Sequence, residues 1–370
     1  MINVFGSMVG KEELAEVKTS IDNQWLGMGP KVEKFEKLFT ERIGQDFVLI
    51  DNCSNGLYLA VQLLSLPKGS EVIVPANTWV SCATAVILNG CVPVFADCDH
   101  DTLNVTDETI ADVITVKTKA IMVVHYSGYP VDVEEIKRFG LPIIEDVAHA
   151  VDSKVDNTYC GTMGDIGVFS FDSMKNLACG ELGGITCKSS VLTEKAISSR
   201  YCGLSKSGLQ NATTKDRWWE YDLNGYCFKM LPNDIMASIG LAQLRKLSYL
   251  QGKRRAIWEQ YQEEIGGDGD RMPPEIQHSY FTYFVRLNER DELAKFLLDN
   301  GIYTTVRYQP LHQLFKEFYR GPLEVAEEFG ERGLNLPLHP NLTWKEVDYI
   351  IGKVKNFYSK TLIRREALCQ

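Results

Sequence analysis

The sequence predicts an α/β fold, with a large domain built on a mostly parallel sheet and a small α+β domain after it. Short apolar runs alternate with amphipathic, helix-like stretches between residues 45 and 190, which is typical of parallel strands joined by crossover helices. A long helical segment from residue 233 then precedes a second, shorter strand and helix pattern. With 370 residues, 45% hydrophobic and 24% charged, the chain is long enough for both cores.

Six apolar runs are the expected strands of the large sheet. They cover residues 47–50, 72–74, 92–95, 120–124, 142–144 and 166–169, with helix-like stretches such as 57–66 and 81–88 between them. In sheets of this kind, ligands bind beyond the carboxyl ends of the strands. Polar residues that follow these runs are therefore the first candidates for a functional site.

The second domain is expected to begin near residue 245. The segment 234–244 is apolar nearly all round, whereas 246–264 is charged, as expected of one helix that leaves one core and joins another. The division predicts a large domain of residues 1–244, including an N-terminal arm, and a small domain of residues 245–370. Within the small domain the sequence predicts strands at 283–287 and 303–307 and helices at 291–300 and 344–357.

Composition excludes several classes of partner and compartment. The formal net charge is −10 and no long basic run occurs, which argues against nucleic acid or an anionic membrane as the main partner. The start lacks the pattern of a signal peptide, and no run of about eighteen apolar residues occurs. The ten cysteines form no Cys-x-x-Cys pair. We expect a soluble cytoplasmic protein with reduced thiols and no metal site.

Three residues near predicted strand ends suggest a specific chemistry. Lys175 lies in a loop just past the run 166–169, and Asp146 and His149 lie at the end of another run. A pyridoxal phosphate enzyme needs an amine to form a Schiff base and a carboxylate to keep the pyridine nitrogen protonated, so that the ring acts as an electron sink. Lys175 and Asp146 have the residue types and the positions for these two tasks.

Each of these residues also has a simple structural interpretation. Lys175 alone is a solvated loop lysine, and Asp146 alone is a salt-bridged or helix-capping carboxylate. His149 is either a core histidine with satisfied hydrogen bonds or a donor to the phenolic oxygen of the cofactor. Their joint placement at strand ends favours the functional interpretation of all three.

Other candidates surround a phosphate site. Ser54 is a natural N-cap for the helix that runs on from Leu57, and helix N-termini bind phosphate through free amides and the macrodipole. Ser170, on the strand before Lys175, is within reach of a phosphate oxygen. Trp79 follows a strand end, where it either stacks on a planar ring or packs as an ordinary aromatic.

Several short motifs, in order along nearly the whole chain, resemble those of the nucleotide-sugar aminotransferases, the perosamine-synthase-like group of the aspartate aminotransferase superfamily. The segments that carry the resemblance are Gly27-Met28-Gly29-Pro30 with Phe35-Glu36, residues 71–75, residues 144–150, residues 164–175, residues 237–244, residues 308–312 and residues 336–339. The resemblance implies a pyridoxal 5′-phosphate enzyme with the superfamily's fold. It also implies a homodimer with shared active sites.

The resemblance assigns roles to individual residues. It implies that Lys175 forms the Schiff base, that Asp146 pairs with the pyridine nitrogen and that His149 lies by the ring oxygen. It further implies phosphate contacts from Ser54, Asn55 and Ser170, stacking by Trp79, and substrate contacts from Lys229, Tyr308 and His312. The loop that reaches the neighbouring subunit in relatives often reads Gly-Tyr-Asn-Tyr-Arg-Met, whereas this chain has Gly225-Tyr226-Cys227-Phe228-Lys229-Met230. Lys229 there offers a point charge where relatives have the bidentate fork of an arginine.

The function expected from these residues is transfer of an amino group from an amino acid, with L-glutamate as the expected donor, to the keto group of a nucleotide-linked keto deoxysugar. Such a reaction belongs to amino-sugar and surface polysaccharide biosynthesis. The rival functions on the same fold are an aminocyclitol aminotransferase and a sugar dehydratase. Related 3-dehydratases carry histidine at the position of Lys175, which favours transamination. A ligand-binding homologue without turnover and a nucleotide-binding oxidoreductase are further alternatives, and the latter lacks the Gly-x-Gly-x-x-Gly turn.

Overall fold

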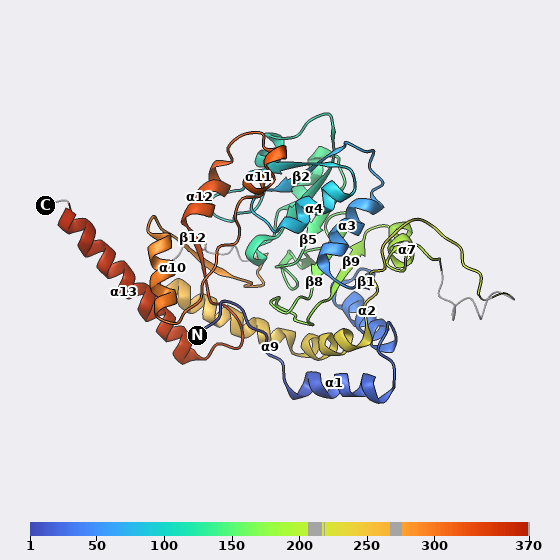
Figure 1. Ribbon diagram of the computed structural model, residues 1–370, viewed down its shortest axis with the longest axis horizontal. Helices are drawn as coiled ribbons and strands as arrows, with labels where there is room; N and C mark the ends of the chain where they lie inside the picture. The colour runs from blue at the N-terminus through green and yellow to red at the C-terminus, as the bar shows by residue number, and fades with distance from the viewer. Residues whose placement is uncertain (206–216, 218, 267–275, 369–370) are drawn as a thin grey trace.

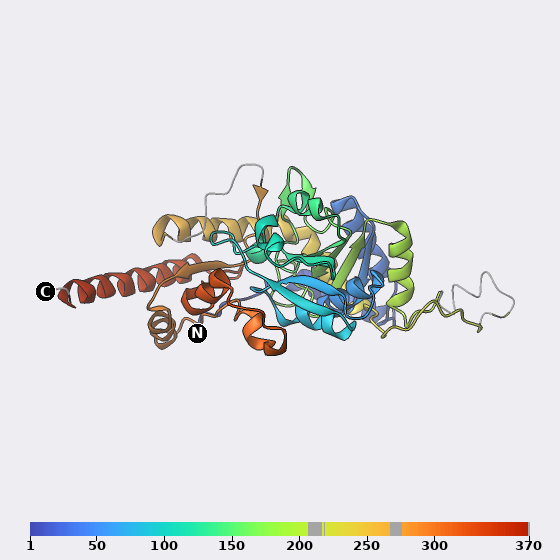
Figure 2. The same cartoon turned by 90° about the horizontal axis from the view of Figure 1, so that it is seen from above.

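A computed structural model of the chain describes residues 1–205, 217, 219–266 and 276–368. One large sheet with helices on both faces forms the body of the protein (Figure 1). Helix α13 (Trp344–Leu368) extends from one end of this body, and the segment that follows α7 (Ser190–Ser199) extends from the opposite end (Figure 2).

The large sheet has seven strands and is mostly parallel, which confirms the predicted fold class. Its order is β1 (Phe47–Ile50), β9 (Gly183–Cys187), β8 (Ile166–Ser170), β5 (Ile143–Asp146), β4 (Thr118–Val124), β2 (Glu71–Pro75) and β3 (Val92–Ala96). Strand β9 is antiparallel to both of its neighbours, and the other adjacent pairs are parallel. All six predicted strands are present within two residues of their expected ends.

Strand β9 was not expected, because its first residues, Gly183 and Gly184, are weak strand formers. The structure explains both glycines by close approach. A Cβ on Gly184 would lie 1.9 Å from the Phe47 ring, and a Cβ on Gly183 would lie 2.6 Å from the backbone at Asn52 and Cys53. The second contact brings β9 directly under the start of helix α3 (Cys53–Leu63).

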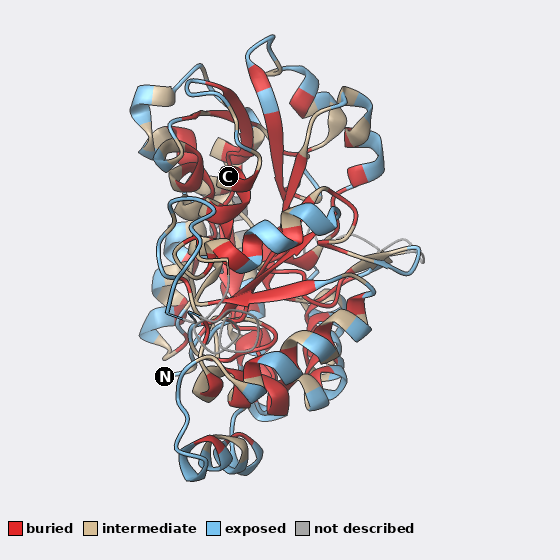
Figure 3. Cartoon of the chain, turned by 90° about the vertical axis from the view of Figure 1, so that its right-hand side faces the viewer, coloured by how far each residue is buried: buried red, intermediate tan, exposed pale blue. Residues whose placement is uncertain are grey.

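Two hydrophobic cores cover the two faces of the sheet. Helices α3 and α4 (Val80–Leu88) pack on one face with α7, and helix α2 (Pro30–Ile43) packs on the other with the first half of α9 (Asp234–Glu264) and the short helices α5 (Asp107–Ala111) and α6 (Val133–Ile136). In Figure 3 the strands and the inward sides of the helices are buried, whereas the outward sides are exposed.

Helix α9 links the large sheet to the C-terminal core. Its N-cap is Asn233, whose side chain accepts a hydrogen bond from the amide of Met236. Helices α1 (Lys11–Asp22) and α2 pack along its first half, so no residue of 234–244 is exposed. The all-round apolar character of this segment is therefore explained within one chain. The predicted domain boundary at 244/245 falls inside this continuous helix and stays a prediction.

The C-terminal core forms around a two-stranded antiparallel sheet of β11 (Tyr283–Arg286) and β12 (Gly333–Leu336), with α10 (Arg290–Asp299), the second half of α9 and α13. The prediction of a strand at 303–307 is wrong. This stretch makes a single bridge, Thr305 with Asn335, and then runs to the carboxyl ends of the large sheet. The remaining elements are β6 (Lys154–Val155), β7 (Thr158–Tyr159), β10 (Ile276–Gln277), α11 (Leu311–Leu314), α12 (Glu324–Arg332) and the 3₁₀ turns Tyr126–Gly128, Lys137–Phe139 and Lys316–Phe318.

Candidate active site

A pocket of about 310 Å³ lies at the carboxyl ends of the parallel strands. Strands β1, β2, β5 and β8 each contribute residues at or just after their ends, as expected for this sheet topology. The sequence-predicted residues that line the pocket are Ser54, Trp79, Asp146, His149, Ser170, Lys175 and Tyr308. Residues far apart in the sequence thus meet at one site.

Lys175 projects into this pocket from the loop after β8. Its amine lies 4.8 Å from the centre of the Phe281 ring and has no carboxylate at ion-pair distance among the described residues. Burial, and after it the positive charge of Arg307, lowers the pKa of the Lys175 amine to about 8. A lysine with such a pKa has a large neutral fraction near neutral pH, as a nucleophilic amine requires.

Asp146 ends strand β5 and faces the same pocket, with 4% of its surface exposed. One carboxylate oxygen accepts a hydrogen bond from the Ala148 amide at 2.9 Å, and the other accepts one from the Cys82 thiol at 3.2 Å. Burial raises the pKa of the Asp146 carboxyl, and the two hydrogen bonds oppose that rise. A cation placed against this carboxylate would compensate its burial.

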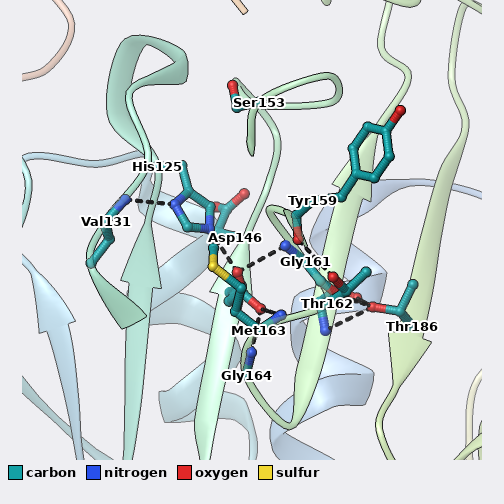
Figure 4. Close-up of polar contacts among 12 residues, drawn as sticks. His125, Val131, Asp146, Ser153, Tyr159, Gly161, Thr162, Met163, Gly164 and Thr186 are labelled. Atoms are coloured by element: carbon teal, nitrogen blue, oxygen red, sulfur yellow. Dashed lines mark hydrogen bonds and ion pairs between the residues drawn. The ribbon is translucent and has the colours of Figure 1, made fainter. Parts of the chain in front are cut away.

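The residue before Asp146 anchors the end of the strand. Glu145 is fully buried, and its carboxylate accepts hydrogen bonds from His125 Nε2 at 2.9 Å and from the amides of Gly161, Met163 and Gly164 at 2.8, 2.9 and 2.5 Å (Figure 4). His125 Nδ1 accepts from the Val131 amide, so the proton of its neutral ring lies on Nε2. These bonds fix strand β5 against β4 and the 161–164 loop, and so fix the position of Asp146.

His149 is held by stacked rings and by a tyrosine. Its ring stacks on Phe281 with 4.1 Å between centroids, and its Nε2 lies 3.0 Å from the Tyr308 hydroxyl. Burial, with the charges of Lys175 and Arg307, holds the pKa of His149 well below its usual range, so the imidazole is neutral. Its Nδ1 is buried and has no hydrogen-bond partner among the described residues.

The start of helix α3, where we expect the phosphate site, differs from the prediction in two details. The N-cap is Asn52, whose side chain accepts from the Asn55 amide at 2.9 Å, so the prediction of Ser54 as N-cap is wrong. Ser54 instead lies in the first turn and lines the pocket, 2.7 Å from the Ser81 hydroxyl. The Asn55 side chain does not line the pocket, because it donates to both oxygens of Asp51.

Ser170 and Trp79 line the same pocket from the ends of two other strands. Ser170 is buried at the end of β8, and Trp79 precedes α4 with 56% of its surface exposed. The Trp79 ring lies 5.9 Å from that of Tyr308, across the pocket mouth. Both positions are compatible with phosphate binding and ring stacking, which stay predictions.

Two predicted substrate contacts lie outside the pocket of their own chain. The imidazole of His312 is buried 2.8 Å from Glu327 Oε1 and stacks on Tyr319. Lys229 is exposed on the segment that extends from the body after α7. Their roles in substrate binding stay predictions.

Sequence reasoning missed three residues that shape the site. Arg307 lines the pocket beside Tyr308, Cys82 donates to Asp146, and Phe281 stacks on His149. A signal for Arg307 existed, because it is the one charged residue at the end of an uncharged, strand-like run and stands next to a motif tyrosine. Nothing in the local sequence distinguishes Cys82 or Phe281 from ordinary core residues.

The fold agrees with comparisons to known proteins. The DegT/DnrJ/EryC1/StrS aminotransferase family matches residues 7–355. The chain belongs to this family. It is 36% identical, over all of both chains, to the dTDP-4-dehydro-2,3,6-trideoxy-D-glucose 4-aminotransferase of Saccharopolyspora spinosa. The predicted relationship and aminotransferase activity are thereby confirmed.

Solved structures of aminotransferases superimpose on nearly the whole chain. The aminotransferase TlmJ from Streptoalloteichus hindustanus has a TM-score of 0.92 and 38% identity, covering 98% of this chain and 100% of its own. The putative sugar aminotransferase Spr1654 from Streptococcus pneumoniae, in its PMP form, has a TM-score of 0.89 and 27% identity, covering 97% and 100%. The predicted sugar-aminotransferase fold is confirmed. No described helix is long and apolar enough to cross a membrane, and the described residues contain no cluster of metal ligands.

Proposed function

We propose that this aminotransferase uses pyridoxal 5′-phosphate to move an amino group from an amino acid, L-glutamate, to the keto group of a nucleotide-linked keto deoxysugar. The observation that carries the proposal is the meeting, in one pocket, of the buried Asp146 carboxylate and the Lys175 amine of lowered pKa. The name of the Saccharopolyspora relative, a dTDP-sugar 4-aminotransferase, supports the acceptor class. We place the reaction in amino-sugar and surface polysaccharide biosynthesis. We also place it in the cytoplasm, because nine of the ten cysteines are free thiols and the tenth, Cys369, lies outside the described residues.

The residues of the pocket fit pyridoxal phosphate. Asp146 offers a buried carboxylate to a protonated pyridine nitrogen, and the unpartnered Nδ1 of His149 offers a hydrogen bond to the ring oxygen. Ser54, Ser170 and the free amides at the start of α3 would hold the phosphate. When bound, the cofactor supplies an electron sink for the carbon that loses its proton.

The chain's own residues account for proton transfer and orientation. The Lys175 amine, with a pKa of about 8, exists in both protonation states near neutral pH, as a group that first accepts and then donates a proton must. In each half-reaction it would remove a proton from the carbon that loses hydrogen and donate it to the carbon that gains hydrogen, so the amine is regenerated before the next substrate enters. Asp146 places its negative charge in the pocket, where it would face the ring nitrogen of the cofactor. The Tyr308 hydroxyl fixes the orientation of the His149 ring. Donor and acceptor occupy the pocket in turn, so ping-pong kinetics follow.

We infer that a second copy of the chain covers the segment that extends after α7. Tyr221, Leu223, Tyr226 and Phe228 are exposed along this segment, and a row of exposed apolar side chains indicates a protein partner. The homodimer would bring Lys229 of each chain to the other chain's pocket. There its ammonium would contact the diphosphate of the nucleotide sugar as a point charge.

The proposed function is tested by product analysis. The protein, loaded with pyridoxal phosphate, is incubated with L-glutamate and a panel of nucleotide 3-keto and 4-keto deoxysugars, with a ketocyclitol as competing acceptor. We expect an aminated nucleotide sugar and an equal amount of 2-oxoglutarate. Amination of the ketocyclitol alone, or loss of water without gain of nitrogen, would contradict the proposal.

A further inference from the structure

Arg307 is a buried cation in the pocket without an anionic partner. Only 8% of its surface is exposed, yet no carboxylate lies at ion-pair distance among the described residues. Within the described part of the chain, its single side-chain hydrogen bond runs from Nη1 to the Tyr308 hydroxyl at 2.9 Å. Two aromatic rings lie against the guanidinium, whose carbon is 3.9 Å from the centre of Phe5 and 5.2 Å from that of Phe281.

Other buried arginines of the chain have oxygen acceptors. Arg200 bonds to the Glu36 carboxylate and, at 2.8 Å, to the Leu49 carbonyl, and Arg254 donates to the carbonyls of Phe281 and Leu338. Arg307 differs because its Nη1 bonds to a hydroxyl and to no carboxylate or carbonyl among the described residues. Its Nε and Nη2 have no partner there either and, unlike Arg254 Nε, are not among the fully enclosed polar atoms. The N–H groups of these two nitrogens are therefore available to a ligand in the pocket that Arg307 lines.

The position of Arg307 is fixed from its backbone outward. Its amide donates to Asn335 Oδ1 at 2.8 Å, and its carbonyl accepts from the Tyr126 hydroxyl. The Phe5 ring covers one face of the guanidinium and limits the rotamers it can take. A cation held in this way is preorganised for an anion, with little side-chain entropy left to lose on binding.

The place of Arg307 relative to Lys175 selects the kind of anion. Both cations lie over the same Phe281 ring, Lys175 Nζ at 4.8 Å and the Arg307 guanidinium at 5.2 Å from its centre. In an amino acid, the carboxylate is bonded to the α-carbon, whose proton the Lys175 amine removes. In a nucleotide sugar, the diphosphate is separated from the keto carbon by several ring carbons. A planar guanidinium also matches a carboxylate in bidentate geometry.

We propose that Arg307 binds the α-carboxylate of the amino donor and so makes the pocket selective for α-amino acids. The proposal rests on the proposed transamination and adds the group that recognises the donor. Because the buried Arg307 guanidinium has no anionic partner among the described residues, the donor's carboxylate would compensate its positive charge. A donor without this carboxylate gains no such interaction.

A matched pair of donors tests this role. L-Glutamate and 4-aminobutyrate differ by the α-carboxylate, and each is mixed with the cofactor-loaded wild type, Arg307→Gln and Arg307→Lys, while the absorbance change of the first half-reaction is followed. We expect Arg307→Gln to raise the apparent dissociation constant of glutamate by about 10- to 100-fold, the loss of a charged bidentate hydrogen bond, and to leave 4-aminobutyrate within about 3-fold. Arg307→Lys, which keeps the charge without the fork, should lie between wild type and Arg307→Gln.

Two further measurements distinguish carboxylate binding by Arg307 from diphosphate binding and from a general effect of lost positive charge. Calorimetry of dTDP and of glutarate, a dicarboxylate without an amine, should show weaker glutarate binding and unchanged dTDP binding in Arg307→Gln. Arg138→Gln, which removes an exposed arginine paired with Asp107 at 2.7 Å, is the charge-matched control. Equal losses for both donors, an unchanged glutamate constant, or a loss of dTDP affinity would overturn the proposal. A wild-type protein that fails to react with glutamate would instead overturn the proposed donor.

Discussion

The lowered pKa of Lys175 predicts how fast the chain captures its proposed cofactor at each pH. Only the neutral amine forms a Schiff base, and its pKa is about 8 where an ordinary lysine has 10.5. At about pH 7.5 the neutral fraction is then roughly a quarter, against roughly one in a thousand for an ordinary lysine, a difference of about two hundred-fold. Because the folded pKa is depressed, the capture rate should rise with pH up to about 8 and then level off.

Stopped-flow absorbance measures this rate on the cofactor-free protein between pH 6 and 10. A lysine model compound with an ordinary pKa, run in parallel, corrects for the ionisations of pyridoxal phosphate itself. Competitive labelling of Lys175 with an amine-reactive reagent gives the same midpoint without the cofactor. Arg307→Gln should move the midpoint upward in part, since burial is the larger cause of the shift and the Arg307 charge the next. A capture rate that still rises steeply at pH 10 would refute the reasoning.

Three further predictions concern the carboxylates and the dimer. Asp146→Asn should preserve the fold but lower turnover by orders of magnitude, because a neutral side chain does not keep the ring nitrogen protonated; an unchanged rate at saturating cofactor would contradict that role. Glu145→Gln leaves two buried donors facing an amide NH₂, which should lower the free energy of unfolding by about 3 kcal/mol and the melting temperature by about 5 °C. The control Glu134→Gln, at a side chain that is 71% exposed, should change the melting temperature little. Equal melting curves for the two variants would exclude the anchoring role of Glu145. Lys229→Ala should raise the KM of the nucleotide sugar and leave the half-reaction with glutamate nearly unchanged. Mixing it with the inactive Lys175→Ala should regain activity at low sugar concentration, since a Lys229 that acts across the interface puts both defects in one site; no gain after confirmed subunit exchange would mean that it does not act there.

Much of the large domain was predictable because six of the seven strands of its sheet contain a continuous apolar run. The six expected strands appear in the sheet, and the residues that follow them meet in one pocket, since parallel strands place their carboxyl ends at the same edge. The strand that was missed, β9, begins with two glycines that are needed for close approach to Phe47 and to the start of α3. Such a requirement comes from tertiary packing and leaves no periodic pattern in the sequence.

The site was predictable where a residue type and a strand end coincide, as for Asp146 and Lys175. Contacts that depend on the exact geometry of a turn, or on residues distant in the sequence, were not. Asn55 turns to Asp51, and Asn52 caps α3, because the turn between β1 and α3 brings these side chains together. The stretch around Arg307 has the composition of a strand, but its backbone is drawn away by hydrogen bonds to Asn335 and Tyr126.

The central claim is that Lys175 is the lysine that carries the cofactor. The most direct measurement is borohydride reduction of the protein loaded with pyridoxal phosphate, followed by protease digestion and mass spectrometry of the peptides. The account predicts a pyridoxyl group on the peptide that contains Lys175, and no such adduct in a folded Lys175→Ala variant. A pyridoxyl group on a different lysine of the wild type would contradict the account.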